Sequence, residues 1–357
     1  MLLTSRAFVE KLELNGLAIS PTRMGALPCC VVSSLDLIDK GIFYALDGNC
    51  RTSYETLARQ FNISANAIKK RVTKLRESGV LKAFSVWLSL SMIDAEMIVA
   101  FINTDGSQDD EHLINTIGNN PMIHRTASLS NGGIMAFGEY ITAQGLGELS
   151  RFLRKQEGVT NVEIHTLLTD KGGKVNFSDL QMKILNELRI DARMSIVELA
   201  KRTGLTARTI RRVLDQLGGN SATTRAFVVR DNLPPNERAS SEPVHFRSIW
   251  NLNAGGSISY AVRLTYDEDQ GNPVDVDSWL RKEYPVAHWY SYASASEPMV
   301  FSTFNVETVG TFEKIHQSLK QGPLIESVET LVLYPQRHFK GLREICLDEL
   351  LEKAGYS

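Results

Sequence analysis

Basic and amide side chains recur at helical spacing in residues 64–75, and this combination is typical of a surface that reads DNA. Ile68, Val72 and Leu75 stand four and then three residues apart, so they face a core while the side chains between them face outward. A helix that presents amide and ammonium groups just after a tight turn has the shape and chemistry to enter a major groove. The predicted DNA contacts here are Ser64 (also suited to the N-cap), Asn66, Lys69, Lys70, Thr73 and Lys74, with Lys82 at the edge of the following strand.

The same pattern returns 142 residues later, where Ile210 and Leu217 correspond to Ile68 and Leu75. Because internal repeats define the architecture of a chain, two helix-turn-helix units are expected. Arginine pairs with guanine and asparagine with adenine, each with roughly 1–3 kcal/mol of discrimination, so the two copies should read unequal half-sites. The second set of predicted DNA contacts is Thr206, Arg208, Thr209, Arg211, Arg212 and Arg225.

The charge balance excludes a chain that is basic throughout, because 39 lysines and arginines against 41 acidic residues leave a net charge of −2. Any nucleic-acid surface must therefore be local, and residues 64–82 carry six basic side chains against the single acid Glu77. The four cysteines show no C-x-x-C spacing, which argues against structural zinc and for a reducing cytoplasm. No apolar run approaches the ~20 residues that span a bilayer, and charged residues interrupt the N-terminal stretch where a signal peptide would need an apolar core.

The segments 96–170 and 257–337 share one order of elements, which indicates a second repeat. Apolar runs and turn signals such as Ser130-Asn131-Gly132-Gly133 predict strand, helix, hairpin, helix and strand in each. The order βαββαβ is that of a ferredoxin-like sandwich. The predicted strands are 97–102, 122–128, 133–141 and 159–168, then 258–265, 286–293, 299–306 and 325–333; the predicted helices are 109–117, 146–153, 276–282 and 311–319.

The predicted fold class is α+β, with tandem winged helix-turn-helix domains that are each followed by a ferredoxin-like βαββαβ domain. Residues 35–46 and 180–188 would form the first helix of each helix-turn-helix unit, and residues 80–90 and 224–229 would supply the wings. The expected domains are an N-terminal extension with a short helix (1–33), winged helix-turn-helix 1 (34–92), βαββαβ domain 1 (93–172), winged helix-turn-helix 2 with a Pro-rich loop at 231–243 (173–255), βαββαβ domain 2 (256–340) and a C-terminal helix (341–357).

The stretch LDLIDKGIFYALDGNCRTSYETLARQFNISANAIKKRVTKLRESGVL resembles the N-terminal DNA-binding signature of the Lrp/AsnC family of transcriptional regulators, and the resemblance covers about 35–340. The second copy, FSDLQMKILNELRIDARMSIVELAKRTGLTARTIRRVLDQL, is also close but departs from the pattern after Leu217, which affects the expected angle of its wing more than its helix. If one of the two units is vestigial, the second is expected to be that one. The resemblance implies that the βαββαβ domains pair through their sheets, first within the chain as a pseudo-dimer and then between two chains. It also implies recognition of two half-sites about one helical turn apart, or a multiple of it.

The resemblance further implies a place for an effector, because family members that sense amino acids usually carry a glycine and an aspartate in the turn between the hairpin strands. The turns here read SNGGIMAF and SASEPMVF, so the first lacks the aspartate and the second lacks the glycine. A domain with no ligand, or with a different one, is therefore favoured over an amino-acid sensor. The candidate effector residues are Asn131, Gly132, Gly133, Ser296 and Glu297.

An enzymatic alternative rests on His124 and His288, which follow Pro-x-x at equivalent strand positions. Sirohaem decarboxylases resemble Lrp/AsnC proteins in fold and use histidines in this part of the domain, and YPVAHWYSYA looks somewhat like their sequence. Two observations favour ordinary strand histidines instead: the hairpins hold no basic cluster for a polycarboxylate, and Arg125 stands alone. No phosphate-binding glycine loop, nucleophile motif or metal-ligand cluster is visible.

The predicted function is therefore that of a cytoplasmic DNA-binding transcriptional regulator that is not an enzyme. Its expected partners are double-stranded DNA and a second copy of the chain, with an amino acid as a possible effector. No cofactor, no metal and no membrane association are expected.

Overall fold

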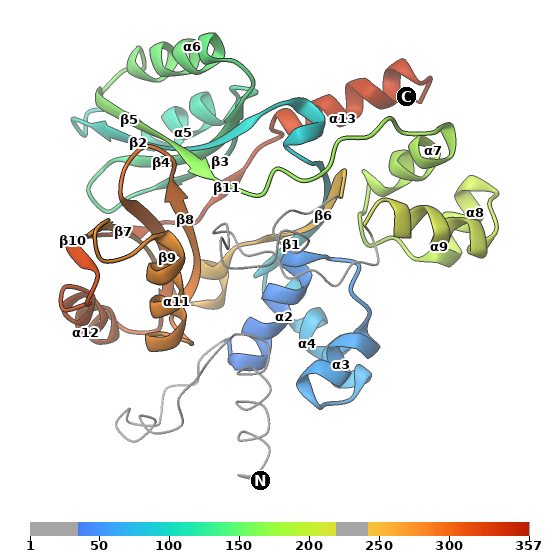
Figure 1. The fold of residues 1–357 in the computed structure, drawn as a ribbon, viewed down its shortest axis with the longest axis horizontal. Helices are drawn as coiled ribbons and strands as arrows, with labels where there is room; N and C mark the ends of the chain where they lie inside the picture. Colours follow the sequence, from blue (N-terminus) through green and yellow to red (C-terminus); the bar gives the residue numbers. More distant parts are fainter. Residues whose placement is uncertain (1–34, 219–241, 357) are drawn as a thin grey trace.

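The computed structural model describes residues 35–218 and 242–356. The predicted N-terminal helix within 1–33, the predicted wing strand 224–229 with Arg225, and nearly all of the loop 231–243 lie outside these ranges. Within them, no helix combines the length and the apolar character needed to cross a membrane. The predicted fold class is confirmed: two helix-turn-helix units and two βαββαβ sandwiches follow one another along the chain (Figure 1).

The two helix-turn-helix units are built alike. The first consists of α2 (Leu37–Gly48), α3 (Tyr54–Phe61) and α4 (Ala65–Glu77), and the second of α7 (Asp179–Leu188), α8 (Ile196–Thr203) and α9 (Ala207–Gln216). The tight turn needs one left-handed residue, which is Asn62 in the first unit and Gly204 in the second, at φ of 53° and 69°. The recognition helices α4 and α9 both bury the predicted apolar stripe, so the side chains between the members of the stripe face outward as expected.

Each βαββαβ sandwich places its helices on one face of a four-stranded antiparallel sheet. The first comprises β2 (Glu96–Thr104), α5 (Asp110–Gly118), β3 (Ile123–Ser128), β4 (Ile134–Tyr140), α6 (Ala143–Arg154) and β5 (Val159–Leu168). The second comprises β7 (Ile258–Tyr266), α11 (Pro273–Glu283), β8 (His288–Ser294), β9 (Met299–Val306), α12 (Val309–Leu319) and β10 (Ile325–Leu333). The strand orders β5-β2-β4-β3 and β10-β7-β9-β8 are the same arrangement, as the repeated pattern predicted.

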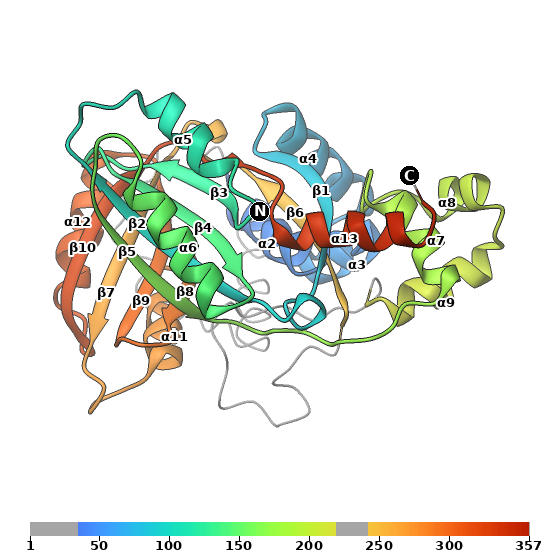
Figure 2. The ribbon, with the colours of Figure 1, turned by 90° about the horizontal axis from the view of Figure 1, so that it is seen from above.

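The two sheets join edge to edge and enclose an apolar interior (Figure 2). β5 pairs with β8 through Leu167 and Leu168, and the bridge between Leu129 and Leu333 connects the opposite edges. Inside, Phe101 packs on Phe301 with ring centroids 5.4 Å apart. The pairing that the sequence suggested between sheets is thus made within one chain. Pairing between two chains stays a prediction. Because these sheet edges already pair within the chain, two chains would have to pair through other surfaces.

A two-stranded ribbon links the two halves through β1 (Leu81–Leu88) and β6 (Val244–Trp250), which run antiparallel. β6 was not predicted from the sequence. The sequence pattern predicted that β1 belongs to a wing of its own unit, whereas the described partner of β1 comes from the second half. Short 3-10 turns, Ser91–Ile93 and Leu252–Gly255, follow the two ribbon strands and lead into β2 and β7.

The last elements return to the first half of the molecule. β11 (Arg337–His338) pairs with β3, and α13 (Leu342–Lys353) packs across β1. The Arg343 guanidinium, which is buried, donates from Nε to the Leu88 carbonyl at 2.5 Å and contacts His245 Nδ1 at 2.8 Å. Gly341 lies so close to His124 that an added Cβ would stand 2.6 Å from the histidine Cβ, so a side chain cannot be accommodated there without movement.

Candidate functional site

The outward face of α4 carries the predicted DNA-contacting residues of the first unit. Asn66, Lys69, Lys70, Thr73 and Lys74 are all exposed on the helix, and Lys82 is exposed at the start of β1. Ser64 acts as the N-cap, since its hydroxyl accepts a hydrogen bond from the Ala67 amide at 3.1 Å. The cap leaves the helix start well ordered for a phosphate or base edge to approach it.

One basic residue of this segment serves the fold instead of the surface. Arg71 Nη1 lies 2.8 Å from carboxylate oxygens of both Asp36 and Asp39, at the start of α2. This ion pair fixes α4 against α2 and removes Arg71 from the free positive charge of the face. Five of the six basic side chains in residues 64–82 therefore remain outside this ion pair, and the lysines of α4 stay exposed for contact with DNA.

The equivalent face of α9 is also open. Arg208, Arg211 and Arg212 are exposed, whereas Thr209 is half-buried and its hydroxyl contacts that of Thr206 at 2.9 Å. Thr206 is the N-cap, with its hydroxyl accepting from the Thr209 amide at 3.2 Å. The arginines are thus placed to contact a ligand, and the two threonines mainly order the helix start. The DNA-contacting roles of both faces stay predictions.

A reciprocal contact fixes the two helix-turn-helix units relative to each other. Arg51 Nη1 donates to the carbonyl oxygens of Ala192 and Met194 at 2.7 and 3.0 Å, and Arg193 Nη1 donates to the carbonyl oxygen of Cys50. Arg51 and Arg193 are repeat counterparts, as are Cys50 and Ala192, each pair being 142 residues apart. The contact between the two units is therefore reciprocal, as a local pseudo-twofold relation between them would require.

The ribbon obeys the same pseudo-symmetry. The Cys50 amide donates to the Phe246 carbonyl of β6 at 2.8 Å, and the Ala192 amide donates to the Phe84 carbonyl of β1 at 3.4 Å. Each helix-turn-helix unit therefore rests on the ribbon strand contributed by the other half. The ribbon acts as a common base for both helix-turn-helix units.

The first unit is also anchored to the second βαββαβ domain. The Lys40 ammonium is buried and donates to the backbone carbonyl oxygens of Pro285, Val286 and His288, while the Tyr44 hydroxyl donates to that of Trp289. Burial raises the pKa of Tyr44, so its hydroxyl stays protonated and able to donate. The second unit instead contacts α13, where Arg189 Nη1 lies 3.1 Å from Asp348 Oδ1.

The two predicted effector turns lie at separate joins of the sheet and are not brought together. The first turn docks on β10, with the Ser130 amide donating to the Val332 carbonyl at 3.0 Å. The second docks near β5, with Glu297 Oε2 at 3.9 Å from His165 Nδ1. Glu163, His165 and Glu297 could together offer three metal-ligand atoms. However, Arg263 Nη2 lies 2.5 Å from Glu163 Oε1, so that carboxylate already forms an ion pair with a guanidinium.

The two histidines of the enzymatic alternative also lie apart. His124 Nδ1 is 3.1 Å from Glu139 Oε1, and its ring packs edge-on against Trp87. His288 Nε2 is 2.8 Å from Ser291 Oγ, and burial holds the pKa of His288 well below its usual value. Both side chains are buried in different surroundings, which supports the simpler interpretation of strand histidines inside the domain.

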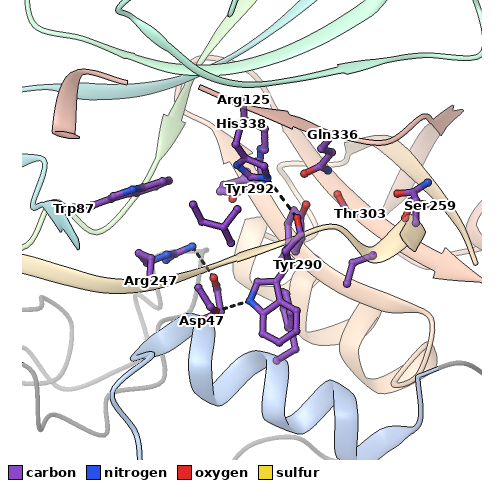
Figure 3. Close-up of a pocket in the computed structure, with 16 residues that line it drawn as sticks. Asp47, Trp87, Arg125, Arg247, Ser259, Tyr290, Tyr292, Thr303, Gln336 and His338 are labelled. Atoms are coloured by element: carbon purple, nitrogen blue, oxygen red, sulfur yellow. Dashed lines mark hydrogen bonds and ion pairs between the residues drawn. The ribbon is translucent and has the colours of Figure 1, made fainter. Parts of the chain in front are cut away.

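A cavity lies where the first helix-turn-helix unit, the ribbon and both sheets meet (Figure 3). Its volume is about 60 Å³, and it is lined by Phe43, Asp47, Trp87, Arg125, Arg247, Ser248, Ile249, Trp250, Leu252, Asn253, Ser259, Tyr290, Tyr292, Thr303, Gln336 and His338. This site was not predicted from the sequence. Arg125 is the single Lys or Arg of the two hairpins, as the sequence indicated, and Arg247 from β6 lines the same cavity.

Two family models match the helix-turn-helix units. The model described as a winged helix-turn-helix DNA-binding domain matches residues 35–82, and the model described as an AsnC-type helix-turn-helix domain matches residues 178–217. The match at 178–217 covers the second copy, whose sequence departs from the pattern only near its end.

Curated relatives show the same likeness. The regulatory protein AsnC of Escherichia coli (strain K12) is 45% identical over 47 residues, which are 13% of this chain and 31% of that protein. The chain thus spans about a third of the length of the AsnC relatives it matches. An uncharacterized HTH-type transcriptional regulator of Pyrococcus horikoshii is 27% identical over 142 residues, which are 38% of this chain and 88% of that protein.

Two solved structures share the fold along nearly the whole chain. The siroheme decarboxylase NirDL has a TM-score of 0.51 at 12% identity, and the match covers 90% of this chain and 100% of that one. The same protein in complex with an iron-uroporphyrin III analogue has a TM-score of 0.52 at 11% identity, covering 89% and 99% of the two chains. At this identity the likeness concerns the fold alone.

Proposed function

We infer that this chain, which belongs to the Lrp/AsnC family through its two helix-turn-helix units, is a DNA-binding transcriptional regulator that reads a pseudo-palindromic promoter site. The observation that carries the proposal is the reciprocal contact of Arg51 and Arg193. This reciprocity supports a pseudo-twofold relation between the two units, and a pseudo-twofold pair of helices would match the symmetry of two inverted half-sites.

The two half-sites should differ in sequence. α4 presents an amide and lysines, whereas α9 presents three arginines, and all of these side chains are exposed. Arginine can bind guanine through two hydrogen bonds, while the lysines act mainly as point charges toward phosphates. We therefore place the stronger guanine preference in the half-site read by α9 and an adenine preference, through Asn66, in the half-site read by α4.

Fluorescence anisotropy tests this proposal directly. The full chain is titrated against its own upstream region and against random duplex of equal length, over a salt series. Specific binding that survives physiological salt, with footprints over two half-sites, is the expected result. Equal affinity for every duplex, or no binding to any duplex, would refute the proposal that the chain is a sequence-specific regulator.

The second candidate is a sirohaem-decarboxylase-like activity, which the whole-chain likeness to NirDL favours. Two features of the structure oppose it. The cavity of about 60 Å³ is far too small for a tetrapyrrole macrocycle, and His124 and His288 lie in different surroundings. Titration with sirohaem, followed by absorbance, tests this candidate; a spectral change lost in both His124→Ala and His288→Ala would support it.

A further inference from the structure

The cavity between the first helix-turn-helix unit, the ribbon and the two sheets contains a cation whose hydrogen-bonding edge is unused. Among the described residues, Arg125 Nε and Nη2 are buried and have no hydrogen-bond acceptor. These two nitrogens form the edge of the guanidinium that binds a carboxylate through two parallel hydrogen bonds. The face of the same group is covered by the Phe137 ring, whose centroid lies 4.0 Å from Arg125 Cζ. The edge is therefore the part of Arg125 left for a ligand.

The charges around the cavity leave Arg125 without a carboxylate of its own. The acid that lines the cavity, Asp47, has Oδ1 3.1 Å from Arg247 Nη2. His338 adds no charge at neutral pH, because burial and the nearby Arg125 lower its pKa to about 3. The lining thus carries two guanidinium groups against one carboxylate. A buried guanidinium whose Nε and Nη2 edge lacks acceptors is costly, so an anion bound to that edge would be stabilised.

The size and the walls of the cavity restrict the anion. A volume of about 60 Å³ holds roughly four to six water-sized groups, at about 10–15 Å³ each. That is a carboxylate with one to three further non-hydrogen atoms. Asp47 is already paired with Arg247, so an amino acid would leave its ammonium group without a counter-charge. The aromatic rings of Trp87, Trp250 and Tyr290 suit the remaining carbon atoms.

We propose that this cavity is a binding site for a small carboxylate without an amino group, held by the Nε and Nη2 edge of Arg125. The cavity is lined by α2 and the ribbon as well as by strands of both sheets (Figure 3). A ligand here therefore touches the support of the recognition helices and the sheets at once. Binding of the carboxylate should therefore change the affinity for DNA. This regulatory consequence rests on the proposed DNA-binding function, whereas carboxylate binding itself does not.

Isothermal titration calorimetry of the full chain, in a buffer free of carboxylates and phosphate, tests the site. The probes are acetate, pyruvate, L-alanine and inorganic phosphate. Saturable binding of pyruvate or acetate at one site, stronger than that of L-alanine and phosphate, is expected. Binding of phosphate alone, or no saturable heat with either carboxylate, would overturn the proposal without reference to any variant.

Matched variants then locate the site. Arg125→Gln and Arg125→Lys should each weaken binding at least tenfold, the second because an ammonium group cannot form the paired hydrogen bonds. Arg337→Gln is the control. Arg337 is half-buried, stands in the sequence between the cavity-lining residues Gln336 and His338, and pairs with Glu111 outside the cavity. Circular dichroism confirms that each variant is folded. Unchanged affinity in folded Arg125→Lys would contradict the assigned contact.

The regulatory consequence is measured separately, by anisotropy of the promoter duplex with and without saturating pyruvate. A change of at least threefold in DNA affinity is expected, and it should be absent in Arg125→Lys. Unchanged DNA affinity at full occupancy would overturn the coupling. Because the calorimetry contains no DNA, carboxylate binding without DNA binding refutes only the proposed regulator, and the converse result refutes only the carboxylate site.

Discussion

Arg51 and Arg193 occupy equivalent places in the two helix-turn-helix units, and each donates hydrogen bonds to backbone carbonyls of the other unit. Arg193 also lies over the Tyr54 ring, with Cζ 4.6 Å from the ring centroid. A charged donor that binds a buried carbonyl contributes about 1.5–3 kcal/mol. The contact is thus strong enough to set how the recognition helices are spaced.

Loss of this contact should relax the spacing between half-sites. In Arg51→Gln with Arg193→Gln, binding to a single half-site should stay within twofold of the wild type. Preference for one spacing of paired half-sites should fall at least tenfold. Anisotropy on duplexes with half-sites moved in steps of one base pair measures this. If the double variant keeps the wild-type spacing preference, the contact does not position the helices.

The two lysines of α4 should account for part of the salt dependence. Each phosphate contact contributes about 0.9 to the slope of log affinity against log salt, so Lys69→Ala with Lys70→Ala should reduce the slope by about 1.8. Lys314→Ala with Lys320→Ala, two exposed lysines on or next to α12, is the matched control and should leave the slope unchanged. An unaltered slope in the α4 variant would exclude those lysines from the interface.

Arg208 should determine sequence preference in one half-site only. Its removal in Arg208→Ala should lower discrimination at the contacted base by roughly 1–3 kcal/mol. Asn66→Ala should do the same in the other half-site. Competition assays with single-base variants of each half-site separate the two effects. Symmetric loss in both half-sites from either variant would contradict the assignment of one helix to each.

His338 should make the fold less stable as the pH falls. Burial and Arg125 lower its folded-state pKa to about 3, whereas an unfolded histidine titrates near 6.5. The unfolded chain therefore binds the extra proton first, and stability is lost as the pH falls from about 7 toward 3. Between pH 7 and pH 5 this histidine should cost about 2 kcal/mol.

The variant His338→Gln should recover that amount in the difference between the free energies of unfolding at pH 7 and pH 5. Chemical denaturation at both values measures it. His112→Gln, at an exposed position on α5, is the control and should change the difference little. An equal pH dependence in His338→Gln and the wild type would show that His338 titrates alike in the folded and the unfolded chain, against the lowered pKa.

The repeated local patterns made most of the fold predictable. β5, β9 and β10 have the predicted bounds, and the apolar stripes of α4 and α9 are buried as expected. These elements are specified by periodicity within ten or so residues, which the sequence displays directly. The strand β6 was missed because its pairing partner, β1, lies some 160 residues away and a long polar insertion separates it from α9.

The candidate sites were predictable to different degrees. Exposure of the recognition faces follows from helix geometry, but the ion pair of Arg71 with Asp36 and Asp39 depends on how α2 crosses α4. The cavity could not be foreseen, because Asp47, Arg125 and Arg247 come from three distant segments. One signal was available: Arg125 is a lone charge in a strand whose neighbours are buried.

The position of α13 has a consequence for synthesis of the chain. Ser85 in β1 donates to Glu344 Oε1 at 2.8 Å, and β1 pairs with β6. The first recognition helix therefore emerges from the ribosome long before the ribbon and helix that support it. Domains generally fold as units during translation, so the first helix-turn-helix unit can fold early, yet it must wait for residue 344 before its base is complete. A nascent chain thus cannot complete the support of its first recognition helix until residue 344 has been made.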